Sequence, residues 1–242
     1  MPAIRDLIAA GDVLLLPQQT FRMLRRREPF VVVWLAVSLT SAALTLSQLE
    51  IVRRATAFFV ARGAPSEIAP AADALLSRWT LTDVWLAPVG TAARWCAEAA
   101  LVQLGRRIAR RRRDVPVRGG FRSLLCVIAY ASVPGVLAQA IDLWVTWRDG
   151  PGFTPELLPL RPAATALDAW LPLATSDPLV GAALGVLTPF AVWELILRII
   201  GLREMCGARR RTAFVWAAPA WLAIRLLSAY FDTPGISSSW PT

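Results

Sequence analysis

Long runs of hydrophobic residues alternate along the chain with short basic segments. A window of about 19 residues, the length that crosses a bilayer as a helix, finds five such runs. They cover residues 30–49, 84–105, 123–145, 179–200 and 212–231. A sixth stretch, residues 157–173, contains Pro159, Pro162 and Pro172. Prolines leave backbone groups without hydrogen-bond partners, which is costly in lipid, so this stretch is predicted to be an interfacial helix or loop. The pattern predicts an all-α, polytopic membrane helical bundle with five transmembrane helices.

A short amphipathic helix is predicted before the first run. Its apolar positions are Ile4, Leu7, Ile8, Gly11, Leu14 and Leu15, with Arg5, Asp6 and Asp12 opposite. Pro17 ends this helix, and we expect Phe21 and Leu24 of the next segment to face lipid. Nothing in this region has the pattern of a cleaved signal peptide. The chain therefore divides into a cytoplasmic amphipathic lead-in (1–29), a five-span membrane domain (30–231) and a short external tail (232–242).

The basic residues predict the orientation of the chain. All 26 are arginine, and the formal net charge is +9. Most of them lie before the first span, between the second and third, and between the fourth and fifth, which places these segments in the cytoplasm and the C-terminus outside. The basic run RRIARRRR at residues 106–113 lies between two spans, so we expect it to contact anionic lipid headgroups rather than nucleic acid.

The composition excludes much of enzymology. The chain has no histidine and no lysine, which removes histidine-based proton transfer, the common imidazole metal ligand and Schiff-base chemistry. Cys96, Cys126 and Cys206 lie far apart, without the spacing of a zinc site or a disulfide framework. We therefore expect no catalytic residues, no metal and no cofactor.

Charged residues inside the predicted spans are the main candidates for function. Arg94 and Glu98 are four residues apart in the second span, as are Glu194 and Arg198 in the fourth, so each pair can neutralise itself on one helical face. Cross-pairing between the two spans is open if the helices touch. Either these charges line a polar route, or they form ion pairs that fix helix register. Arg225 is expected nearer the outer boundary, where it can extend to the headgroups.

Prolines and small residues predict how the spans pack. Pro134 and Pro189 should kink the third and fourth spans. Gly181 and Gly185 form a small-xxx-small pattern that permits close helix approach, and Ala131 with Gly135 repeats the spacing. The pattern favours packing within the chain, with homo-oligomerisation as the alternative.

Several stretches resemble the YIP1 family (Yip1 domain) in its bacterial form. The opening GDVLLLPQQTFRMLRRREPF resembles the family's lead-in, and GGFRSLLCVIAYASVPGVL resembles its third span, with Tyr130 and Pro134 at motif positions. FAVWELILRIIGLREMCGARRRTAFVWAAPAW follows, with Trp193 and Gly201 in the family's Trp-to-Gly-Leu-Arg turn. The chain departs from the pattern at Glu194, where a small or neutral residue is usual.

The resemblance implies a multi-pass protein of the bacterial plasma (inner) membrane. Eukaryotic members engage prenylated Rab GTPases, but the arginine- and alanine-rich composition is typical of a bacterial genome, so this role is not carried over. We expect a non-enzymatic membrane scaffold or interaction protein, with a membrane-protein partner or a second copy of the chain. The alternative is a small transporter or channel that uses the intramembrane Arg/Glu pairs. An intramembrane enzyme is the third class.

Overall fold

Helices make up all the regular structure in the part of the chain that the computed structural model describes, which is residues 2–61, 81–112, 119–149 and 188–232. The helices are α1 (Pro2–Leu15), α2 (Pro17–Leu24), α3 (Val31–Ala61), α5 (Leu81–Arg112), α6 (Phe121–Ala131), α7 (Val133–Asp149), α9 (Pro189–Cys206) and α10 (Arg210–Asp232). The all-α prediction is therefore confirmed.

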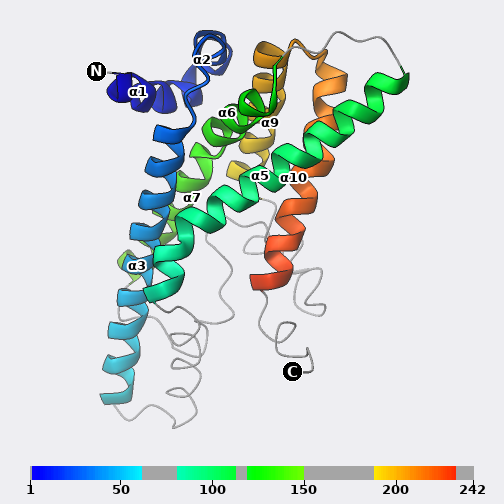
Figure 1. Ribbon diagram of the computed structural model, residues 1–242. Helices are drawn as coiled ribbons and strands as arrows, with labels where there is room; N and C mark the ends of the chain where they lie inside the picture. The colour runs from blue at the N-terminus through cyan, green and yellow to red at the C-terminus, as the bar shows by residue number, and fades with distance from the viewer. Residues whose placement is uncertain (1, 62–80, 113–118, 150–187, 233–242) are drawn as a thin grey trace.

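The longer helices form a bundle in which successive rods run in opposite directions. In Figure 1, α3 descends, α5 returns diagonally, α6 and α7 descend together, α9 returns and α10 descends. The short helices α1 and α2 lie at the end where α3 and α6 begin and α9 passes into α10. The segments predicted to be cytoplasmic therefore gather at one end of the bundle.

Helix α9, the fourth rod of the bundle, begins and ends at residues suited to helix termini. The hydroxyl of Thr188 accepts a hydrogen bond of 2.9 Å from the backbone N–H of Ala191, and Pro189 occupies the first helical turn. At the other end Gly207 adopts φ 69°, the left-handed conformation that glycine tolerates best. The predicted kink at Pro189 is thus wrong, because this proline starts α9, where a missing N–H costs no helical hydrogen bond.

The third rod is interrupted, so that α6 ends at Ala131 and α7 begins at Val133. The backbone N–H of Ser132, between the two helices, lies within hydrogen-bonding distance of the carbonyls of both Ile128 and Ala129. Pro134 follows in the first turn of α7, where it has no N–H to continue the helical ladder. The interruption has the position and the cause expected from Pro134.

Helix α9 lies at the centre of the packing and contacts α2, α6, α7 and α10. A Cβ on Gly201 of α9 would lie 2.7 Å from Val127 Cγ1 and 3.0 Å from Phe21 Cζ, so only glycine allows α2 and α6 to approach this closely. Phe21 is fully buried, and Leu24 is 5% exposed. The expectation that these two side chains face lipid is therefore wrong, because they fill the core between α2 and α9.

Helix α1 lies across the end of α3 rather than along the bundle (Figure 1). It buries Ala9 and Val13 against the bundle and exposes Ile4, Leu7 and Ile8 on its other side. This exposed apolar ridge has the helical spacing that suits a helix lying in the surface of a membrane.

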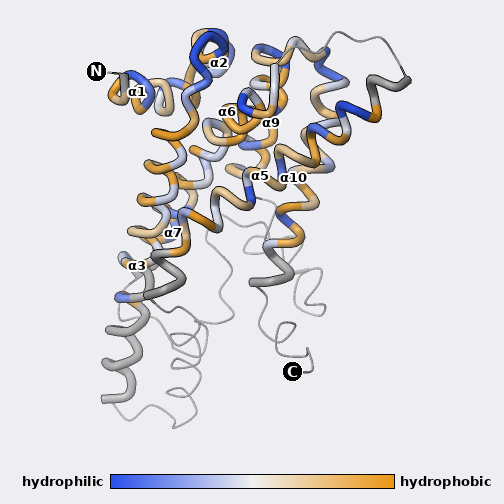
Figure 2. Tube along the Cα trace, viewed as in Figure 1, coloured by the Kyte–Doolittle hydropathy of each residue, from blue (hydrophilic) through white to orange (hydrophobic). Residues whose placement is uncertain are grey.

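One helical stretch among the described residues, Phe121–Val145, is long and apolar enough by composition to cross a membrane, and Val31–Ser47 is a shorter apolar helix. Charges interrupt the apolar runs in α5 and α9, at Glu98 and Arg198 for example. Figure 2 shows apolar residues along the middle of the rods and polar ones concentrated toward the end that carries α2. The number of spans therefore stays a prediction.

Some sequence predictions fall outside the described residues. These are the Gly181 and Gly185 packing motif, the interfacial stretch 157–173 and nearly all of the tail 232–242. The three cysteines are described and none is in a disulfide.

Candidate functional site: a buried cluster of four charges

Three helices bring four charged side chains together inside the bundle. Glu98 comes from α5, Glu194 and Arg198 come from successive turns of α9, and Arg225 comes from α10. Two carboxylates and two guanidinium groups give the cluster no net formal charge. The four residues lie in the regions where α9 packs on α10 and α5 packs on α10.

Arg198 is the central member of the cluster. Its Nε donates to Glu98 Oε1 at 2.5 Å and its Nη2 to Glu98 Oε2 at 3.1 Å, a two-pronged pairing. Its Nη1 also donates to Glu194 Oε2 at 3.3 Å. That same oxygen accepts a bond of 2.6 Å from Arg225 Nη2, so Glu194 links the two arginines.

The cluster is almost closed to its surroundings. Glu98, Glu194 and Arg198 are 2%, 4% and 5% exposed, whereas the Arg225 side chain is 30% exposed. A Cβ on Gly135 of α7 would lie 2.5 Å from Glu194 Oε1, so this carboxylate rests directly against a fourth helix. Pairing and hydrogen bonds of this kind are what allow charges to remain buried.

The structure corrects two expectations about these charges. Glu98 pairs with Arg198 of another helix, whereas Arg94 is exposed and forms no ion pair with Glu98 within the described chain. Arg225, expected to extend toward headgroups, instead turns inward to Glu194. The cross-pairing left open between the second and fourth spans is the arrangement found, because the packing of three helices supplies a closer partner than the next helical turn.

Little free space adjoins the cluster. A cavity of about 10 Å³ lies beside Glu98 and Arg198, bounded by apolar residues of α5, α6, α9 and α10. This is about the volume of one water molecule by the same measure. The arrangement can hold helices together, but it leaves no room for a ligand of several atoms.

The family-motif positions have different surroundings. Tyr130 is fully buried, and its hydroxyl lies 3.4 Å from the carbonyl oxygen of Asp6 in α1. Pro134 is also buried, and Gly201 is the close-packing position described above. Trp193 is 45% exposed and points away from the core. Tyr130 and Gly201 lie at contacts between helices, and none of these residues joins the charge cluster.

Polar contacts also connect the helices at the α2 end of the bundle. Arg22 Nε donates to Glu204 Oε2 at 2.8 Å, and this carboxylate raises the pKa of the Arg22 guanidinium. The Ser123 hydroxyl donates to the carboxylate of Glu28. These contacts join the lead-in segment to α9 and α6.

Arg106 differs from its predicted role as a headgroup contact. It is 2% exposed, its Nη2 donates to the carbonyl of Gly119 at 2.9 Å, and its guanidinium lies 5.8 Å from the ring centre of Trp216. The first arginine of the basic run therefore packs inside the bundle, because the start of α6 and the side of α10 cover it.

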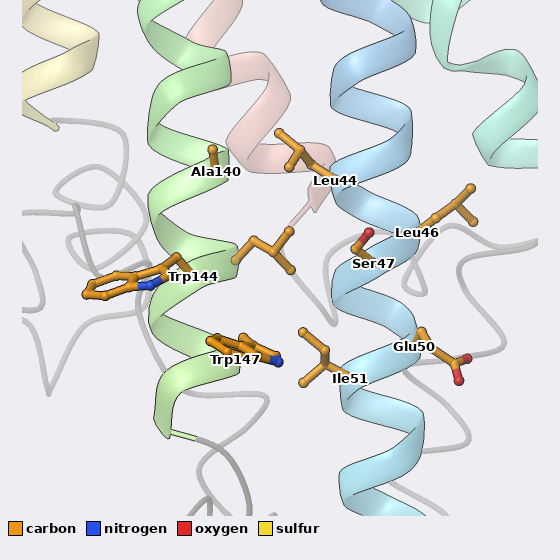
Figure 3. A pocket seen from close by; sticks show the side chains of 9 residues that line it. Leu44, Leu46, Ser47, Glu50, Ile51, Ala140, Trp144 and Trp147 are labelled. Carbon is orange, nitrogen blue, oxygen red and sulfur yellow. The ribbon is translucent and has the colours of Figure 1, made fainter.

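Larger hollows lie elsewhere in the described part of the chain. An apolar groove of about 700 Å³ runs between α3 and α7, where Leu44 faces Ala140 and Ile51 faces Trp147 (Figure 3). The second hollow, of about 520 Å³, lies between α1 and α2, and its lining includes four arginines and one aspartate. Neither is near the charge cluster, and the described residues contain no group of acidic or cysteine side chains placed to hold a metal.

Comparison with known proteins identifies the family. The model of the Yip1 domain matches residues 11–231, which spans every described helix except the first turns of α1 and the last residue of α10. No curated protein and no solved structure matches the chain. The Yip1 domain is a membrane-protein domain, and the buried charges, the surface helix α1 and the apolar rods agree with such a protein. The chain therefore belongs to the Yip1 domain family.

Proposed function

We propose that this Yip1-domain protein is a non-enzymatic scaffold or interaction protein of the bacterial plasma membrane. The observation that carries the proposal is the closure of the four-charge cluster. Both oxygens of Glu98 are bonded to Arg198, and one oxygen of Glu194 is bonded to two arginines. Charges that satisfy one another beside a water-sized cavity are suited to fixing helix register rather than to binding a substrate.

The proposed topology has five spans, with the N-terminus in the cytoplasm and the C-terminus outside. Its support is the position of the arginine-rich segments at one end of the bundle, together with the alternating directions of the rods (Figure 1). Retention of basic segments in the cytoplasm then orients the whole bundle. A partner, either another membrane protein or a second copy, would bind the lipid-facing sides of a bundle held rigid by the cluster.

A small transporter or channel is the second candidate function. One observation favours it, namely that Arg225 is 30% exposed and connects the surroundings with the buried carboxylate of Glu194. Such a function requires the ion pairs to open and admit an ion or proton.

The deciding experiment compares wild-type protein with the Glu98→Leu/Arg198→Leu double variant, which leaves the pair of Glu194 and Arg225 intact. Tagged full-length protein is cross-linked in native membranes and purified, and the same proteins are reconstituted in liposomes for proton and ion flux. The scaffold proposal expects the same cross-linked partner or dimer from both proteins and no flux from either. Flux by the wild type that the folded double variant lacks would overturn it in favour of transport.

A further inference from the structure

The hollow between α1 and α2 brings several positive charges to one place. Its volume is about 520 Å³, and its lining includes Arg5, Asp6 and Ala9 of α1, Arg22 of α2, and Arg26 and Arg27 just beyond α2. Four arginines against one aspartate leave a strongly positive lining. We call this hollow the arginine pocket.

Three of these four arginines have no ion-pair partner in the part of the chain that the structure describes. Arg22 is bound to Glu204 through Nε. Arg5, Arg26 and Arg27 are exposed and have no ion-pair partner among the residues that the structure describes. Several guanidinium groups gathered around a single carboxylate, that of Asp6, still attract an anion strongly, and the planar fork of arginine matches phosphate oxygens in particular.

The pocket is a formed part of the fold rather than a loose tail. Ala9 of its lining is buried against the bundle, and Leu24 is in the core. The carbonyl of Asp6 lies 3.4 Å from the hydroxyl of Tyr130, which is itself fully buried in α6. The backbones that carry the arginines are therefore positioned by packing, which lowers the entropic cost of binding.

The position of the pocket indicates where its ligand comes from. The exposed apolar ridge of α1, formed by Ile4, Leu7 and Ile8, enters the acyl boundary of a membrane when α1 lies in the surface. The charged groups on the same helix are then at the depth of lipid headgroups. The cytoplasmic leaflet, on which this end of the bundle is proposed to lie, has a negative surface potential that comes from anionic lipids.

We propose that the arginine pocket is a specific binding site for the phosphate of an anionic phospholipid headgroup. Arg5 on α1 and Arg26 and Arg27 beyond α2 surround the phosphate, while Arg22 stays on Glu204 and holds α2 in place. The lipid thereby joins the lead-in helices to the membrane surface. This proposal rests on the membrane orientation given above and not on the scaffold role.

The test measures retained phosphatidylglycerol by native mass spectrometry. Full-length protein is purified in nanodiscs of phosphatidylcholine with increasing fractions of phosphatidylglycerol, as wild type, as Arg5→Gln/Arg26→Gln and as the matched control Arg107→Gln/Arg203→Gln. The control removes two exposed arginines near the same end of the bundle but outside the pocket. The pocket variant should bind phosphatidylglycerol about thirtyfold more weakly than the control, since each of the two removed arginine contacts contributes about 1 kcal/mol.

Other outcomes would contradict the proposal. Equal losses in the two double variants would show only a diffuse attraction of the basic end for anionic membranes. Displacement of phosphatidylglycerol by an equal concentration of inorganic phosphate would assign the pocket to a free anion instead of a lipid. Melting temperatures in pure phosphatidylcholine check that the variants fold, and the single variant Arg27→Gln repeats the test at a position outside both helices. A failure here leaves the scaffold proposal standing, because cross-linking tests that separately.

Discussion

Arg198 of α9 binds Glu98 of α5 through two hydrogen bonds that join residues 100 positions apart in the chain. The same arginine is also within hydrogen-bonding distance of Glu194, one helical turn before it. The long-range contact is the more extensive, since it uses both oxygens of its partner. The helical neighbour instead shares its oxygen with Arg225.

This relationship predicts which pair of residues can be removed together. Arg198→Leu should lower stability by about 3–5 kcal/mol, because the buried Glu98 loses its partner. Glu98→Leu/Arg198→Leu should recover most of that loss, since the remaining Glu194 and Arg225 neutralise each other. The melting temperatures of the two variants in detergent measure the difference. A double variant as unstable as the single one would contradict the pairing.

The helical pair provides the matched control. Glu194→Leu/Arg198→Leu also removes one acid and one base, but it leaves Glu98 and Arg225 without their partners. We expect this variant to be clearly less stable than Glu98→Leu/Arg198→Leu by the same melting assay. If instead it were the more stable of the two, the pairing within α9 would be the dominant one.

Close packing at Gly201 gives a second prediction. Gly201→Ala should destabilise the protein by about 1–3 kcal/mol, because the new Cβ would overlap Val127 of α6 and Phe21 of α2. Gly90→Ala on α5 is the control, since no atom lies within 4 Å of its added Cβ. There the helix propensity of alanine should raise stability by up to about 1 kcal/mol. Thermal unfolding of both variants tests this contrast. Similar changes in stability at the two sites would contradict the close packing at Gly201.

The burial of Phe21 gives a third prediction. Phe21→Ala should cost about 3–5 kcal/mol, because it removes a fully buried ring between α2 and α9. Met23→Ala, two residues away and 54% exposed, should cost less than about 0.5 kcal/mol. The comparison is made by chemical unfolding in mild detergent. Equal small effects would mean that Phe21 faces lipid after all.

The arginine distribution gives a fourth prediction, on topology. Alkaline phosphatase fused after Thr242 should be active, because the proposed C-terminus is outside, whereas a fusion after Arg112 should be inactive. A reporter that is active only in the cytoplasm should give the opposite pattern at both positions. An active cytoplasmic reporter at Thr242 would rule out the five-span topology.

Hydropathy and local chemistry in the sequence were sufficient to predict the helical elements. Long apolar runs predict helices because a bilayer or a core leaves backbone groups only each other to bond with. Spacing alone predicts the amphipathic α1, and Pro134 predicts the interruption between α6 and α7. Thr188 and Pro189 also form a typical helix start in the sequence. Hydropathy instead placed the start of the fourth predicted span at residue 179, so this helix start was not predicted.

Which side of a helix faces protein was decided only by the tertiary structure. Phe21 and Leu24 are buried in the core, whereas Ile4 and Ile8 are exposed, yet all four are equally apolar. Lipid tails and a protein core are both hydrocarbon environments, so hydropathy cannot distinguish them. The same reasoning explains why Arg106, in the middle of a basic run, could not be recognised as buried.

The sequence by itself determined that the predicted spans carry charges needing partners, because an unpaired charge in hydrocarbon is costly wherever it lies. It named Arg94, Glu98, Glu194 and Arg198 on that ground. The tertiary structure decided the partners: Arg198 for Glu98, and Arg225 together with Arg198 for Glu194. Spacing along one helix identifies only neighbours on that helix. The partners of a buried charge depend instead on how α5, α9 and α10 pack. That packing follows from close contacts at small residues such as Gly135.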